Sequence, residues 1–180
     1  MKTGEMQAVM EAVIYVADDL VKTEHFREVF PEESLESIKL ALAEMVEAFN
    51  RREGGMQIRE IAGGWRMTTR PEHHEHIRSY LKTRPGSKLS LAALETLAVI
   101  AYKQPVTQAE IQTIRGKKSN SAVLQTLLEK KLVSLQGRKQ VVGRPILYGT
   151  SREFLIHFGL NSLADLPTQE EFAQIVGEQS

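Results

Sequence analysis

The 180-residue sequence contains no cysteine. That absence excludes a disulfide framework, a thiolate nucleophile and a cysteine-ligated zinc site. No apolar run approaches the roughly 18 residues that a membrane span requires. The first residues, Met1 to Glu11, also lack the apolar core of a signal peptide. Together these absences predict a soluble, cytoplasmic protein without membrane contact.

Motifs of common enzyme classes are absent too. The sequence has no G-x-S-x-G, no phosphate-binding P-loop and no H-E-x-x-H, and nothing pairs a nucleophile with a base. His73, His74 and His76 are the one cluster of metal-binding type, and His73 and His76 share a helix face. Because no third ligand follows from the spacing, a solvated helix surface is the preferred interpretation. We expect no enzymatic activity, no cofactor and no metal.

Charge is balanced overall but unevenly distributed. Lys and Arg number 23, as do Asp and Glu, yet residues 1–82 hold 11 basic and 15 acidic side chains. Residues 83–151 hold 11 basic and 3 acidic, and residues 152–180 hold 1 and 5. A basic block between two acidic ones indicates an anionic partner, or an acidic segment of the chain or of its dimer mate.

Helical periodicity dominates the first half of the chain. Apolar residues follow helical spacing over residues 5–17, and a short helix after Thr23 and a longer one from Ser34 carry plausible caps. Alternation around Gly63-Gly64 then predicts a β-hairpin. Pro71 suits the first turn of a helix that reaches about Leu81.

The same order returns after a linker at residues 83–87. Ser90 caps a helix, Thr107 and Glu110 form a capping box, Ser119 caps a third helix, and Ser151 caps the last. Strands are expected at 132–135 and 146–148. Ala17 and Thr23 are six residues apart, as are Ala101 and Thr107, at an offset of 84.

A repeated order of three helices, hairpin and helix is typical of the winged helix-turn-helix, in which the hairpin covers an open side of a small core. We therefore predict a mainly α protein with small β-hairpins, built from two tandem winged helix-turn-helix domains. Their expected ranges are 1–82 and 88–160, followed by a tail at 161–180. In the tail, Thr168 to Glu171 can cap one more helix through Phe172 and Ile175.

Two kinds of partner fit the second domain. Basic residues surround the turn into its third helix and occupy its wing, as in a DNA-reading module. The side chains at the start of that helix are small and polar, and the helix has no Arg or Lys until Lys130. Since Arg and Lys make the commonest specific contacts to guanine, this gives little support for direct reading of bases. Helix-turn-helix domains also serve as protein-docking modules, and both alternatives stay open. The basic residues are Arg115, Lys117, Lys118, Arg138, Lys139 and Arg144.

Long motifs in this region resemble one family, segregation and condensation protein B (ScpB). The longest runs from Leu94 to Thr107 (LETLAVIAYKQPVT), and a second runs from Gly143 to Thr150 (GRPILYGT). One departure is Lys117 to Ser121, where the family often has an acidic residue. Shorter matches are Glu110-Ile111, Ile114 to Gly116, Leu127-Leu128, Gly137 to Lys139, Phe154-Leu155, Phe158 to Leu160 and Leu163 to Pro167.

The resemblance implies a homodimer formed mainly through the first domain and a role in chromosome condensation and segregation during cell division. It implies binding to the kleisin ScpA, which links the heads of the SMC ATPase. The chain would then be a non-catalytic, nucleoid-associated subunit, with a weak contact to DNA left open. The alternative is a winged-helix DNA-binding regulator. Because Arg and Tyr are enriched at interface hot spots, the candidate partner-binding residues are Tyr102, Lys103, Arg115, Arg138, Arg144 and Tyr148.

Overall fold

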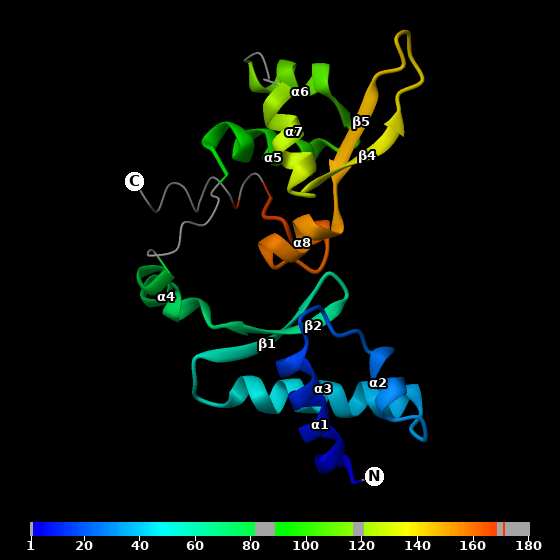
Figure 1. Cartoon of the computed structure of the whole chain (residues 1–180), viewed down its shortest axis with the longest axis vertical. Coiled ribbons are helices and arrows are strands. Elements are labelled where there is room, and N and C mark those ends of the chain that lie inside the picture. The colour runs from blue at the N-terminus through cyan, green and yellow to red at the C-terminus, as the bar shows by residue number, and fades with distance from the viewer. Residues whose placement is uncertain (1, 82–88, 117–120, 169–170, 172–180) are drawn as a thin grey trace. The chain divides into compact units, whose positions relative to one another are not determined.

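The chain forms two compact units, residues 1–85 and 86–180, in a computed structural model that describes residues 2–81, 89–116, 121–168 and 171 (Figure 1). The division falls inside the predicted linker. Each unit contains three helices followed by a hairpin and a further helix, as the sequence predicts. The fold is mainly α with small antiparallel sheets, and both units are winged helix-turn-helix modules. No helix of the described residues is long and apolar enough to cross a membrane.

Three helices build the core of the first unit. Their apolar stripes meet around Met10, Phe26 and Ile38, which are fully buried. The Ser34 hydroxyl caps the third helix by accepting the Ser37 N–H at 3.1 Å, as predicted. The helices are α1 (Thr3–Val16), α2 (His25–Val29) and α3 (Leu35–Arg51).

The hairpin of the first unit consists of β1 (Met56–Ile61) and β2 (Gly64–Thr69). The prediction of a Gly63-Gly64 turn is wrong by one residue: Ala62 and Gly63 form it, with φ of 48° and 73°. Positive φ at both positions is the geometry whose twist suits a two-residue hairpin. Gly64 instead opens β2, where an added Cβ would lie only 2.9 Å from the Leu20 Cβ.

The start of α2 also differs from expectation. Thr23 does not cap it; the helix begins at His25, its N-cap is Glu24, and no side chain caps it. The Lys22 N–H instead donates to His25 Nδ1 at 3.3 Å. The His25 ring nitrogen therefore accepts a backbone N–H just ahead of the helix, and no side chain accepts one from the first turn.

After the hairpin, Pro71 opens the short 3₁₀ helix η1 (Pro71–His73), which leads into α4 (His74–Leu81). His73, His74 and His76 lie on these two elements. No group of three or more His, Cys, Asp or Glu side chains in the described part of the chain is arranged to hold a metal ion.

The second unit repeats the three-helix core. Leu97, Ile100, Ile111 and Leu127 are fully buried at its centre. Ser90 caps the first helix by accepting the Ala93 N–H at 3.2 Å, as predicted. The predicted cap of the third helix, Ser119, lies outside the described residues. The helices are α5 (Leu91–Lys103), α6 (Gln108–Arg115) and α7 (Ser121–Glu129).

A three-stranded antiparallel sheet closes this core, with the strand order β3-β5-β4. The two-residue β3 was not predicted, because its residues look only like the start of the α6 capping box. Ser151 caps the following helix α8, and Gly159 ends it with φ of 66°. The elements are β3 (Val106–Thr107), β4 (Val133–Arg138), β5 (Ile146–Thr150), α8 (Arg152–Phe158) and the 3₁₀ helix η2 (Leu163–Asp165).

The repeat extends to how the hairpins are held. Val21, between α1 and α2, exchanges two backbone hydrogen bonds with Trp65 of β2, at 3.0 and 2.7 Å. In the second unit β3, between α5 and α6, pairs with β5 in the corresponding way. In both units the segment between the first two helices therefore anchors the hairpin over the core.

The depth of the second core can be tested at Leu127, which is 0% exposed. Replacing it with Ala removes buried methyl groups and leaves a cavity, so we expect Leu127→Ala to lower the free energy of unfolding by about 2–5 kcal/mol. Leu91→Ala is the control, because Leu91 is 73% exposed in the same unit; its effect should stay within about 0.5 kcal/mol. Urea denaturation followed by circular dichroism measures both, and equal effects would contradict the assigned core.

Candidate partner-binding site

Gln104 joins the end of α5 to the sheet. Its Oε1 accepts the Thr150 N–H at 2.8 Å and the Thr150 hydroxyl at 3.0 Å, while its Nε2 donates to the Ala101 carbonyl at 3.0 Å. Gly149 permits this approach, since an added Cβ would lie 2.9 Å from Gln104 Oε1. Parts of the two long sequence motifs therefore meet here, and their role at this point is to hold α5 against β5.

Glu110 ties the start of α6 to the wing. Its Oε2 accepts the Thr107 N–H at 2.8 Å, which completes the predicted capping box. Its Oε1 accepts a charge-assisted bond from Lys139 Nζ at 2.5 Å. The Lys139 hydrogen bond, and then those from Thr107, lower the pKa of Glu110 from 4.5 to about 2. The same carboxylate thus takes part both in the cap of α6 and in the contact between α6 and the wing.

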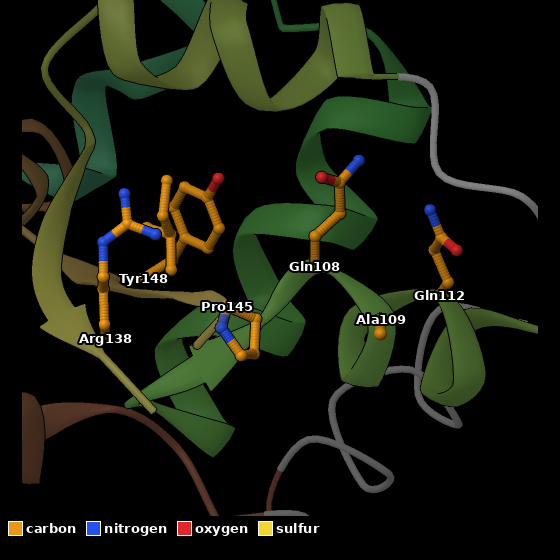
Figure 2. A pocket seen from close by; sticks show the side chains of 7 residues that line it. Gln108, Ala109, Gln112, Arg138, Pro145 and Tyr148 are labelled. Carbon is orange, nitrogen blue, oxygen red and sulfur yellow. The ribbon is translucent and has the colours of Figure 1, made fainter. Parts of the chain in front are cut away.

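A groove of about 530 Å³, here called the wing groove, lies between α6 and the wing. Figure 2 shows the α6 side chains on one side of it, with Arg138 and Tyr148 on the other. Gln108 and Gln112 are one helical turn apart and offer amide donors and acceptors at its edge. Such a lining can hydrogen-bond an extended segment that carries a negative charge. The lining residues are Gln108, Ala109, Gln112, Arg138, Pro145, Ile146 and Tyr148.

Three of the predicted site residues lie at or beside this groove. Arg138 is exposed, and its Nη1 donates to the Arg144 carbonyl at 3.1 Å. Arg144 is exposed at the end of the wing loop with φ of 39°, two residues after the fully exposed Val142. Tyr148 is only 9% exposed and belongs to the core cluster. It therefore contributes to the wall of the groove more than to an open contact surface.

Tyr102 and Lys103 lie elsewhere, at the C-terminal end of α5. Tyr102 is 43% exposed, and its hydroxyl donates to the Pro167 carbonyl at 2.6 Å. It lines a second cavity, here called the α5–α8 groove, with a volume of about 320 Å³. The structure therefore does not bring all the predicted residues together. The lining residues of this groove are Leu94, Leu97, Ala98, Ala101, Tyr102, Phe154, Phe158, Leu160, Leu166 and Pro167.

Arg115 has a different environment from the one expected of a contact residue. Its side chain is 8% exposed, and its Nη2 donates to Glu95 Oε2 at 2.6 Å. The ion pair joins the end of α6 to α5 and directs the guanidinium into the unit. No local spacing could have shown this, because the two partners are 20 residues apart in the sequence.

Gln108 and Gln112 are the groove residues that sequence reasoning missed. The signal was present, since they stand four residues apart on a helix whose buried residue is Ile111. Polar residues at this spacing are common on exposed helix faces, however. Only the hairpin opposite them makes this pair part of a groove.

Comparisons with known proteins point to one family. The chain matches the family described as "Segregation and condensation complex subunit ScpB" over residues 8–169. Segregation and condensation protein B of Syntrophotalea carbinolica is 45% identical over 178 residues, covering 99% of this chain and 89% of the relative. The crystal structure of ScpB from Mycobacterium tuberculosis is 32% identical, covers 89% of this chain and 98% of its own, and has a TM-score of 0.42.

A third similarity concerns part of the chain. The structure described as a dimer of the ScpB N-terminal domain complexed with ScpA peptide is 24% identical. The match covers 43% of this chain and 95% of that one, with a TM-score of 0.39.

The Glu110 contacts predict a specific pH dependence. Because its pKa is lowered in the folded unit, Glu110 stabilises that unit fully above its ordinary value of 4.5. This stabilisation is lost as the pH falls toward about 2. Glu110→Gln should flatten the fall in unfolding free energy between these two pH values and lower stability at neutral pH. Urea titrations at a series of pH values measure the slope.

Glu153→Gln is the matched control, because it removes an exposed carboxylate of α8 in the same unit. It should leave the acid slope close to that of the unmodified chain. If Glu110→Gln and Glu153→Gln change the slope equally, the lowered pKa of Glu110 does not contribute to stability as described.

Proposed function

Because the chain belongs to the segregation and condensation protein B family, we propose that it is a non-catalytic subunit of a bacterial SMC–kleisin complex. In this role it acts in chromosome condensation and segregation during cell division, in the cytoplasm and at the nucleoid. The observation that carries the proposal is the family match, which spans residues 8–169 and describes a complex subunit. ATP hydrolysis is assigned to the SMC protein, which this chain reaches through the kleisin ScpA.

The first unit is proposed to form the homodimer. Exposed large apolar side chains on its helices support this assignment, since apolar surface is costly to leave in water. Tyr15 and Val16 at the end of α1 are 76% and 75% exposed, and Leu40 on α3 is 64% exposed. Burying side chains of this size between two copies supplies the main favourable free energy of association.

The second unit is proposed to bind the kleisin, with the wing groove as the contact surface. The basic block of residues 83–151 suits a partner segment with negative charge. Arg138 and Arg144 stand beside the groove, and the fully exposed Val142 adds an apolar contact at the wing tip. Exposed Arg beside an apolar anchor is a frequent composition of interface hot spots.

The full-length chain purified with and without its ScpA-type kleisin tests the assembly. Light scattering during gel filtration should give twice the chain mass for the protein alone and a larger, stable complex with the kleisin. Absence of a complex at micromolar concentration would count against the proposed function, and a monomeric mass would remove the dimer.

One substitution tests whether the wing contacts the kleisin. Arg144→Ala should weaken kleisin binding about tenfold or more, the loss expected for a hot-spot arginine. Arg152→Ala is the control, because Arg152 is also exposed but lies on α8. Calorimetric titration of each variant with the kleisin measures the dissociation constant. Equal affinity for both variants would exclude the wing from the contact surface.

DNA binding is the second candidate function, favoured by the same basic block. If the second unit contacts phosphates, its affinity for duplex DNA should fall steeply with salt, because each neutralised phosphate releases a counterion. Fluorescence anisotropy of a labelled duplex between low and physiological salt measures the slope. Binding that is absent at low salt, or independent of salt, would remove this candidate.

A further inference from the structure

The Tyr148 side chain brings an unpartnered hydroxyl to the wing groove. Tyr148 stands on the central strand β5, opposite Val106 of β3 and Leu135 of β4, and is only 9% exposed. Within the described residues its hydroxyl forms no hydrogen bond, yet it is not among the polar atoms that are sealed from solvent. Because a buried tyrosine hydroxyl usually has a hydrogen-bond partner, this one is available to a ligand in the groove.

Three further polar side chains line the same groove. Figure 2 shows the Tyr148 ring between the Arg138 guanidinium and the Gln108 amide. Gln108 and Gln112 are half-buried on α6, and their amides form no hydrogen bond within the described part of the chain. The groove thus presents one positive charge, one hydroxyl and two amides on otherwise apolar walls.

The charge of Arg138 is not neutralised within the basic block. Arg138 forms no ion pair among the described residues, and its Nη1 donates to the Arg144 carbonyl, a neutral acceptor. The block of residues 83–151 contains three acidic side chains, and each of them already has a partner. A guanidinium at a groove without a carboxylate of its own attracts an anion. The three partnered side chains are Glu95 with Arg115, Glu110 with Lys139, and Glu129 with Gln125.

A carboxylate fits this set of donors. Its two oxygens accept up to about four hydrogen bonds, so a guanidinium and a hydroxyl can donate to the same group. The bond from the guanidinium is charge-assisted, and therefore stronger than a neutral one. The backbone of DNA fits less well, because its binding depends on several phosphate contacts and this groove is lined by one guanidinium.

We propose that the wing groove contains a carboxylate subsite, in which Arg138 and Tyr148 bind one Asp or Glu side chain of an acidic partner segment. This inference rests on the proposed function, in which the segment belongs to the kleisin. It adds the chemical group that is recognised and the atoms that recognise it. The amides of Gln108 and Gln112 bond to the backbone of the same segment. Tyr148 then has two roles, since its ring packs in the core and its hydroxyl binds the ligand.

Removing the Tyr148 hydroxyl tests the subsite in the full-length chain. Tyr148→Phe keeps the ring in the core, so the free energy of unfolding should not fall. Affinity for the ScpA-type kleisin should fall about tenfold, the loss expected for one hydrogen bond to a charged group. Tyr80→Phe is the matched control, because it removes a tyrosine hydroxyl from α4 of the first unit. Calorimetric titration and urea denaturation measure the two quantities, which the control should leave unchanged.

A double-mutant cycle identifies the recognised group on the partner. Each Asp and Glu of the bound kleisin segment is changed in turn to Asn or Gln. One of these changes should weaken binding to the unmodified chain about tenfold. The same change should have an effect of about twofold or less on binding to Arg138→Gln, because that variant has already lost the contact.

The outcomes separate the subsite from the proposed function. If Tyr148→Phe binds the kleisin as tightly as the unmodified chain does, the subsite is wrong and the proposed function stands. A cycle in which no acidic residue couples to Arg138 has the same meaning. Absence of any binding by the unmodified chain would overturn both. If Tyr148→Phe weakens binding of a labelled DNA duplex and leaves kleisin binding unchanged, the groove binds phosphate and the proposal is overturned.

Discussion

The carboxylate of Glu110 connects three parts of the second unit. It caps α6 by accepting the Thr107 N–H, and Thr107 belongs to β3, which pairs with β5. It also accepts the bond from Lys139 that fixes the wing against α6. Together with the pairing of β3 and β5, these bonds connect the two sides of the wing groove, α6 and the hairpin. A charge-assisted bond suits this purpose, since it is shorter and stronger than a neutral one.

The two grooves of the second unit have contrasting chemistry. The wing groove has glutamine amides and an arginine at its edge, which suit a polar, negatively charged partner segment. The α5–α8 groove is lined almost entirely by apolar side chains, which suit an amphipathic helix. The first resembles a surface kept open for a partner.

Much of the fold was predictable because it depends on local signals. Ser34, Ser90, Thr107 and Ser151 cap the helices that the sequence assigns to them. These caps involve residues only three positions apart, so their spacing is visible in the chain. The predictions of a Thr23 cap and of a Gly63-Gly64 turn were wrong. The backbone path around these residues decides where the helix begins and which two residues form the turn, and that path does not follow from residue types alone. Gly64 is needed for its close approach to Leu20, not for the turn itself.

The candidate site also contains residues whose positions could be predicted from the sequence and one, Arg115, whose position could not. Arg138, Arg144 and Tyr148 are close together because they belong to one hairpin, and hairpin pairing can be predicted from the sequence. The burial of Arg115 could not be predicted in this way, since its ion-pair partner Glu95 lies on another helix. The sequence by itself determined the order of the helices, the caps at Ser34, Ser90, Thr107 and Ser151, the repeat and the family. Only the tertiary structure decided which polar groups face solvent and which are paired inside, because burial and ion pairing depend on residues far apart in the chain.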